Sequence, residues 1–227
     1  IRDHCVTGVQ TCALPICDGW YGEDLLIDFA GLDVDVENLD LEKSKISIKN
    51  ISLIKPNIQY RDYPGNPLRK ATASVKVSNE INTQEKGFDI FTNQLVIKQG
   101  LFRFDKQTER SPYENHFDEL HMCYADLNIN AKNISFKNDS LLAYLNLSTK
   151  ERCGFDIKKL EANITFTPQM MEFKNLDIIT NKSHIGNYYA MRYDHFQDDM
   201  QDYINKVKME GRLKQSDVHT DDIAYFA

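Results

Sequence analysis

The chain has 227 residues, with 27 basic and 34 acidic side chains, and its formal net charge is −7. Because this acidic excess is spread along the chain, the composition argues against nucleic acid as a partner. No stretch of about 20 consecutive apolar residues is present, so we expect no membrane span within these residues.

Residues 1–16 differ from the rest of the chain. Residues 6–16 read VTGVQTCALPI, which resembles the translation of a common sequencing-library adapter. We therefore interpret residues 1–16 as an adapter-derived artefact rather than a domain, and exclude them from the fold. A signal peptide is the alternative, although the segment lacks a continuous apolar run. Residues 17–227 are then expected to be an internal fragment of a longer protein.

The exclusion also changes the interpretation of the cysteines. With Cys5, Cys12 and the boundary Cys17 set aside, Cys123 and Cys153 remain. A disulfide between them is compatible with an oxidising compartment, but no framework spacing supports it, and two free thiols fit at least as well.

Alternation of apolar and polar side chains predicts strands along most of the chain. It runs from Leu25 to Tyr60 with a break at Pro56, and two strands are expected on either side of Gly100. Further strands are predicted at residues 71–77, 120–136, 141–148, 155–166 and 171–179. Polar or Pro- and Gly-containing segments predict loops at residues 61–69, 83–87 and 106–115.

One segment has helical rather than strand periodicity. Its apolar residues are Phe196, Met200, Tyr203, Ile204 and Val207. Acidic side chains precede basic ones there, which suits the helix dipole. We expect one short amphipathic helix near residues 197–206 that plugs an end or edge of the sheet.

The pattern apolar-x-apolar-x-Asn-apolar-x-apolar occurs four times, at residues 34–41, 46–53, 129–136 and 171–178. The alternation slips by one place at Asn38, Asn50, Asn133 and Asn175, which would turn the apolar face outward unless the backbone compensates. A β-bulge or tight bend compensates, and Asn tolerates the left-handed conformation of such bends. The repeats predict a curved sheet with one apolar face, and ordinary hairpins of a β-sandwich are the alternative.

The sequence offers little catalytic chemistry. It contains no Gly-rich phosphate loop, nucleophile elbow or zinc ribbon. A metal site within residues 116–123 would use His116, Asp118, His121 and Cys123, but the spacing matches no metal motif, and ordinary surface histidines are favoured. The acidic pairs at residues 198–199 and 221–222 are sequence neighbours that rarely converge on one substrate atom. We therefore expect neither an enzyme nor a bound cofactor or metal.

Several segments are similar, in order and spacing, to the N-terminal half of Bacteroidota TamB proteins, in the AsmA-like superfamily. They are residues 39–56, 100–105, 117–121, 133–139, 203–207 and 223–226. The resemblance implies an inner-membrane-anchored protein that spans the periplasm of a Gram-negative cell envelope. It also implies a β-sheet groove for phospholipid transport in outer-membrane biogenesis, and an outer-membrane barrel partner bound through regions absent here.

Together these observations predict a mainly all-β fold, an elongated, bent, antiparallel-rich sheet that forms an open apolar groove. The expected function is to shelter phospholipid acyl chains in that groove. The alternative is a scaffold for outer-membrane protein assembly or secretion that captures strands by β-augmentation, and an enzyme such as a β-helix polysaccharide lyase is least favoured. The residues expected to line the groove are Val34, Val36, Leu39, Leu41, Ile46, Ile48, Ile51, Leu53, Ile129, Ile134, Phe136, Phe173, Leu176 and Ile178.

Overall fold

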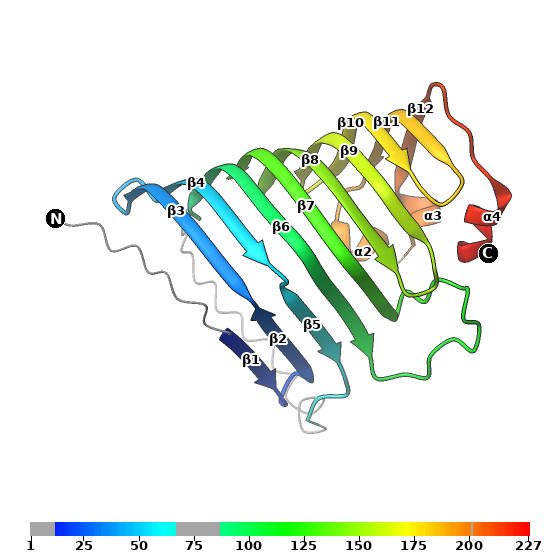
Figure 1. Cartoon of the computed structure of the whole chain (residues 1–227), viewed down its shortest axis with the longest axis horizontal. Helices are drawn as coiled ribbons and strands as arrows, with labels where there is room; N and C mark the ends of the chain where they lie inside the picture. Colours follow the sequence, from blue (N-terminus) through cyan, green and yellow to red (C-terminus); the bar gives the residue numbers. More distant parts are fainter. Residues whose placement is uncertain (1–11, 67–86, 201) are drawn as a thin grey trace.

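The computed structural model describes residues 12–66, 87–200 and 202–227. Its strands form one open 12-stranded sheet (Figure 1), which confirms the all-β prediction. The strands are β1 (Cys12–Asp18), β2 (Glu23–Phe29), β3 (Gly31–Asp40), β4 (Lys45–Ile54), β5 (Asn57–Asp62), β6 (Asp89–Lys106), β7 (His121–Lys137), β8 (Ser140–Glu151), β9 (Asp156–Thr167), β10 (Met170–Ile179), β11 (His184–Arg192) and β12 (Lys208–Leu213).

The sheet is an antiparallel meander over most of its width. From β6 to β12 each strand pairs in antiparallel fashion with the next strand in the chain. The exception is β6, whose first half pairs in parallel with β4 and whose second half pairs in parallel with β5. At the N-terminal side, β3 pairs with β4, and β1 pairs with β2.

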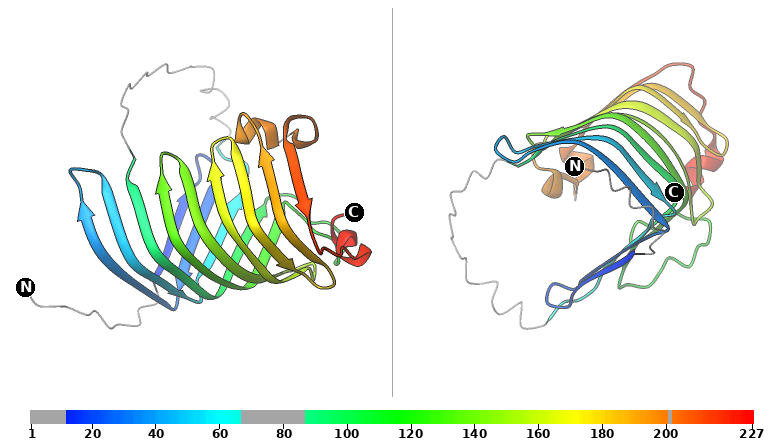
Figure 2. Two further views of the ribbon diagram at one scale, coloured as in Figure 1. Left: turned by 90° about the horizontal axis from the view of Figure 1, so that it is seen from above. Right: turned by 60° about the vertical axis from the view of Figure 1, so that its left-hand side comes forward.

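The sheet bends sharply along a line across its strands (Figure 2). Lys55, between β4 and β5, and Gln99 in β6 and Asp126 in β7 lie on this line, with positive φ angles of 49°, 54° and 50°. Register shifts at Gln99 and Asp126 mark them as bulges, which bend strands and increase their twist. A Cβ atom on Gly100 would lie 3.2 Å from side-chain atoms of Ile97 and Pro56, so the bend brings these segments close together.

The bend divides the sheet into two arms. We call the part formed by β3, β4, residues 89–98 of β6, residues 127–137 of β7, and β8 to β12 the long arm. The short arm contains β1, β2, β5 and the remaining ends of β6 and β7. Figure 2 shows the two arms folded toward each other, so that the sheet has a concave and a convex face.

The bulges predicted from the repeated motif are present, with a difference between copies. Asn133 and Asn175 lie at register shifts and have positive φ angles of 52° and 53°, which confirms the expected left-handed bulges. Register shifts also occur in the β3–β4 pair beside Asn38 and Asn50. Glu37 and Lys49, rather than the two Asn residues, are the extra residues there, and none of these four residues has a positive φ angle.

Helices are few and short. The segment predicted as one helix forms two, α2 (Phe196–Met200) and α3 (Tyr203–Lys206), which lie on the concave side near β10 to β12 (Figure 2). Phe196 packs edge-on against Tyr193 with ring centroids 5.4 Å apart. The chain ends in α4 (Thr220–Ile223) and the 3-10 turn η1 (Ala224–Phe226). None of the helices in the described part of the chain has both the length and the apolar character that a bilayer crossing requires.

Two local expectations are wrong, and two are untested. Residues 12–16, which we interpret as adapter-derived, belong to β1, which pairs with β2 at the edge of the sheet. Ile16 is 59% exposed and so is not part of a buried core, and the adapter interpretation stays a prediction. The two strands expected around Gly100 are one continuous bent strand, and Arg61 and Asp62, expected in a loop, end β5. The strand predicted at residues 71–77 lies outside the described residues.

A candidate apolar binding face

The cross-strand register places apolar side chains in rows that run across the sheet. Side chains that pair directly across a ladder lie on the same face. One uninterrupted row crosses the long arm from β3 to β12. It consists of Leu39, Ile46, Ile90, Phe136, Leu141, Phe166, Met171, Met191 and Met209.

A second uninterrupted row lies close to the bend. It consists of Leu32, Leu53, Ile97, Ile129, Leu147, Leu160, Ile178 and Ile185. Two further rows lie between these and are interrupted at the Asn bulges. They include Val34, Val36, Ile48, Ile51, Ile134, Ala143, Ala162, Ile164, Phe173, Leu176 and Tyr189. We call the surface formed by the four rows the apolar face.

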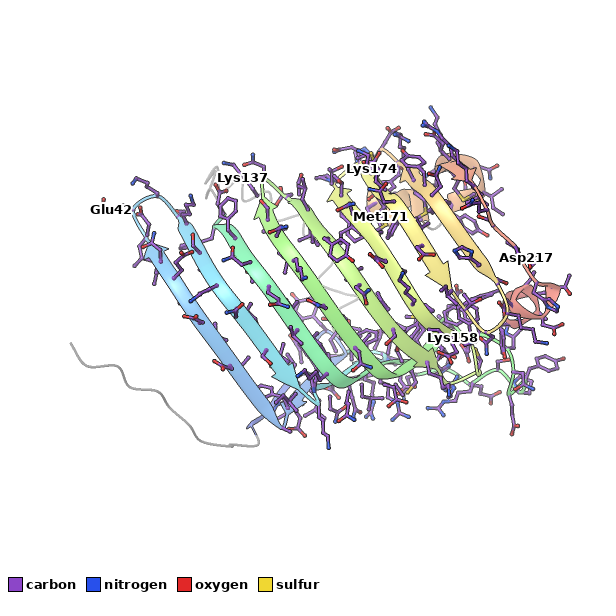
Figure 3. The ribbon with its side chains drawn as sticks, turned by 45° about the horizontal axis from the view of Figure 1, so that its top comes forward. Glu42, Lys137, Lys158, Met171, Lys174 and Asp217 are labelled. Atoms are coloured by element: carbon purple, nitrogen blue, oxygen red, sulfur yellow. The ribbon has the colours of Figure 1, made fainter. Side chains whose placement is uncertain are left out.

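The apolar face is the concave one. Val207 and Tyr193, each two residues from a row residue (Met209 and Met191), flank the α2–α3 segment and are buried. The helices α2 and α3 lie on the concave side of the sheet, so the rows face that side (Figure 2). The convex face is polar, as the nitrogen- and oxygen-tipped side chains over the strands show (Figure 3), with Lys137 and Lys174 among them.

All but one of the residues predicted to line the groove lie in these rows. Leu41 is the exception, because β3 ends at Asp40 and Leu41 lies in the turn that follows. The bulges keep the remaining residues on one face, as expected from the slip in alternation. The structure extends the set with residues of β11 and β12, whose alternation at residues 184–192 and 208–213 was readable in the sequence but was missed.

Burial varies strongly along the face. In β3, Val34, Val36 and Leu39 are 42%, 54% and 55% exposed. In β9 and β10, Ile164 and Leu176 are only 7% and 6% exposed, and with Ala143 and Ala162 they form the buried core of the sheet. Larger side chains, including Phe166, Phe173 and Tyr189, pack around that core.

The apolar surface continues past the bend into the short arm. Gln99 is an extra residue in β6, so Phe102 and Phe104 keep the side of the sheet that Ile97 occupies. Tyr60 stacks on Phe104 with centroids 5.7 Å apart, and Phe102 lies 6.4 Å from Tyr124. Aromatic rings thus line the inner side of the bend.

Several charges on the convex face are paired with one another. The Lys159 ammonium lies 2.8 Å from carboxylate oxygens of both Asp177 and Glu161. Hydrogen bonds from Lys159 and His184 hold the pKa of Asp177 below its usual value. These are solvated surface pairs that keep the convex side wet, and such pairs contribute little to stability.

The residues considered for a metal site have structural roles. His121 is 3% exposed, with Nδ1 3.0 Å from Asp118 and Nε2 3.0 Å from the carbonyl oxygen of Lys106, so the expectation of a surface histidine is wrong for this residue. The described part of the chain contains no group of three or more His, Cys, Asp or Glu side chains that could hold a metal ion.

The two cysteines left open by the sequence are free thiols. Both lie beside the buried carboxylate of Glu151, which accepts backbone N–H bonds from Cys123 and Cys153 at 3.0 and 2.5 Å. Burial and the neighbouring Glu151 raise the pKa of the Cys153 thiol to about 11. A thiol with so high a pKa is a poor nucleophile, so Cys153 is suited to packing rather than catalysis.

A second buried carboxylate fixes the C-terminal segment to the sheet. Asp222 of α4 accepts hydrogen bonds from the Thr180 hydroxyl at 2.5 Å and from the backbone N–H of Ser183 at 2.8 Å. Burial favours a higher pKa for Asp222, but these hydrogen bonds outweigh it and lower the pKa. Phe226 completes the anchor by packing on Phe155 and Phe117.

Comparison of the chain with protein-family models, with curated proteins and with solved structures finds no match. The functional argument therefore rests on the apolar face itself. Rows of aliphatic and aromatic side chains that are open to solvent at the β3 end are the kind of surface that can bind apolar ligands by removing their surface from water.

Proposed function

We propose that the apolar face binds the acyl chains of phospholipids and lets them pass along the rows, without any catalytic step. The observation that carries this proposal is the continuity of the rows across the long arm, with apolar side chains such as Val36 and Leu39 left more than half exposed at one end. Single exposed apolar residues are ordinary on protein surfaces, whereas a contiguous series marks a binding surface.

The energetics suit an acyl chain. Each methylene group moved from water to an apolar surface contributes about 0.8 kcal/mol, so even a partly covered acyl chain gains several kcal/mol. The rows run perpendicular to the strands, and neighbouring strands are about 4.8 Å apart. An extended acyl chain lying along a row would therefore meet a similar side chain at every strand.

In this proposal the chain belongs to a TamB-like protein of the AsmA-like superfamily. Such a protein is anchored in the inner membrane and carries phospholipid through the periplasm for outer-membrane biogenesis. The support is the resemblance of the sequence segments together with a bent sheet whose concave face is apolar. The outer-membrane partner would be bound by parts of the protein that this chain does not include.

Photo-crosslinking tests the proposal. The purified chain is incubated with vesicles of phosphatidylethanolamine that carry a diazirine on one acyl chain, and is then irradiated and digested for mass spectrometry. We expect adducts on residues of the apolar rows. Phe136→Asp, which places a charge in the outermost row, should reduce the yield at least about tenfold, because burying an unpaired carboxylate is strongly unfavourable.

Leu142 provides a matched control. It is 46% exposed, close to the 41% of Phe136, but it pairs with Ser135 and Thr165 and so lies on the convex face. Leu142→Asp should leave the adduct yield unchanged. Equal yields for the two variants, or adducts mainly on the convex face, would overturn the proposal, provided that circular dichroism shows both variants folded.

The second candidate function is a scaffold that captures strands of outer-membrane proteins. It is favoured by one observation, the free edges of the sheet at β3 and β12, since an exposed edge binds an added strand through backbone hydrogen bonds. Binding of a strand peptide from an outer-membrane protein, in the absence of any lipid adduct, would favour this function over the first.

A further inference from the structure

Two of the free edges of the sheet, those of β3 and β12, carry opposite charges; β1, which in the described structure pairs only with β2, is a further edge. Within the described residues, β3 pairs only with β4, and β12 pairs only with β11. The sequence of β3, GLDVDVENLD, contains four acidic side chains and no basic one. Residues 208–214 read KMEGRLK, with three basic side chains and one acidic one. Charges on edge strands usually prevent pairing, but opposite charges on two edges permit those edges to pair with each other.

The directions of the strands also fit. β3 runs away from the bend, and β12 runs toward it, as their antiparallel pairings across the meander require. If β12 of one molecule is placed beside β3 of another with both bends aligned, the two strands are antiparallel. That is the arrangement already used by every neighbouring pair from β6 to β12.

We propose that β12 of one copy pairs with β3 of a second copy, so that molecules join head to tail into one continuous sheet. Continuing the apolar rows fixes the register, with Met209 opposite Leu39 and Leu213 opposite Val34. This register leaves Glu37 as an extra residue of β3, as it already is in the β3–β4 pair. These four side chains are 54%, 55%, 52% and 42% exposed in the single chain, and the pairing would cover them. Burial of such cross-strand apolar pairs stabilises a sheet edge.

The same register aligns opposite charges on the convex face. Lys208 then lies opposite Asp40, Arg212 opposite Asp35, and Lys214 opposite Asp33. Asp33, Lys208 and Lys214 make no ion pair within the described residues, so they are available to a partner. Opposite charges directly across a ladder are favourable, while β3–β3 and β12–β12 pairings would place like charges together.

The remaining acidic residue of β12 does not oppose this pairing. Glu210 is neutralised within its own molecule, because its carboxylate lies 3.3 Å from Arg192 and also pairs with Arg212. The space beside β3 is also open in the described structure. The β1–β2 ladder stops at the pair Cys12 and Phe29. Because β3 begins only at Gly31, β1 does not lie beside β3.

The charge match favours a second copy over an unrelated strand. An arbitrary strand would satisfy the backbone of either edge, but it would not supply three opposite charges and two apolar residues in one register. The contact joins two different surfaces, so it does not close on itself and leads to open assemblies whose length rises with concentration.

Charge reversal tests the assignment by sedimentation velocity of the full chain over a range of concentrations. The unmodified chain should form dimers and longer species, and raising the salt concentration to about 0.5 M should weaken their association because exposed charges are then screened. Asp33→Lys/Asp35→Lys should leave only monomer, since two of the three aligned charge pairs, those with Arg212 and Lys214, then become like-charge pairs. Arg212→Asp/Lys214→Asp should do the same with two acidic edges.

The mixture of the two double variants is the decisive measurement. The unmodified β12 of the first variant matches the unmodified β3 of the second. The β12 of the second variant, now acidic at positions 212 and 214, matches the lysines at positions 33 and 35 of the first. The mixture should therefore regain assembly to within about threefold of the unmodified chain. All four substitutions lie on the exposed convex face, away from the apolar rows, so the lipid adduct yield should not change. A monomeric unmodified chain, or a mixture that stays monomeric, would overturn the head-to-tail pairing and leave the lipid proposal unaffected.

Discussion

The two ends of the apolar face are built from the same sequence motif and differ in burial. In β3, Val34 is 42% exposed, whereas Leu176, at the third apolar position of the motif copy in β10, is 6% exposed. The motif assigns both residues to the same face. The difference shows that alternation decides the direction of a side chain, while its depth depends on the neighbours that the tertiary structure supplies.

Those neighbours differ in number and size. Ile164 in β9 lies between β8 and β10, directly opposite Ala143 and Phe173, and further aromatic rings pack around the cluster. Val34 has a neighbouring strand on one side only, where it pairs with Ile51. A sheet without a second layer therefore has a core only where a strand has neighbours on both sides and large side chains pack around it.

Truncation of side chains at the two ends should give the largest contrast. Ile164→Ala removes buried methyl and methylene groups and should lower the free energy of unfolding by about 2–4 kcal/mol. Val34→Ala, at the exposed end, should change it by less than about 0.5 kcal/mol. Urea unfolding followed by circular dichroism measures both. Similar losses for the two variants would show that the β3 end is covered in solution.

At the buried end of the sheet, the carboxylate of Asp222 should also contribute to the free energy of unfolding. Asp222→Ala leaves the donors of Thr180, Lys182 and Ser183 without their acceptor, and should cost about 1–3 kcal/mol. Because folding lowers the pKa of Asp222, its contribution is complete above the unfolded value of about 3.9 and is lost as the pH falls through the folded value.

The pH dependence gives a specific control for that prediction. Asp222→Asn cannot titrate, so its unfolding free energy should fall less steeply than that of the unmodified chain when the pH is lowered below about 4. Parallel curves for the two proteins would show that Asp222 does not contribute through its charge.

Alanine substitution at two Asn residues of the motif should lower the free energy of unfolding by amounts that differ by about 1 kcal/mol. Asn175→Ala forces an alanine, which has a Cβ atom but no side-chain amide to hydrogen-bond the local backbone, to keep a φ angle near 53°, which costs about 1–2 kcal/mol. Asn38→Ala should have almost no effect, since Asn38 has no positive φ angle. Asn175→Gly should be tolerated better than Asn175→Ala, and the reverse order in thermal melts would contradict the left-handed bulge.

Much of this fold was predictable from local pattern. Alternation located the strands from β2 to β5 and from β6 to β10, and helical spacing located the α2–α3 segment. The slip at Asn133 and Asn175 predicted bulges because Asn is among the few residues that adopt positive φ readily. The same reasoning placed all the groove residues except Leu41 in the apolar rows.

The features that were missed depend on contacts distant in sequence. The bend bulges fall on Gln99 and Asp126, which carry no motif and take positive φ angles because the sheet turns there. The parallel pairing of β4 with β6 joins strands separated by residues 55–88, and a local pattern contains no signal for it. β1 was not predicted because residues 12–16 were interpreted as foreign and because CALPICD does not alternate; it forms a strand only by pairing with β2 at an open edge.

The parallel contact of β4 with β6 has a consequence for how the molecule comes apart. From β6 onward every strand is held by its immediate chain neighbours, so tension on the C-terminus would peel β12, then β11, and so on, breaking a few hydrogen bonds at a time. At the β4–β6 contact the strands run in the same direction, and no short turn joins them. Tension across that contact would load its hydrogen bonds together, in shear, so it should resist force better than the antiparallel pairs from β6 to β12.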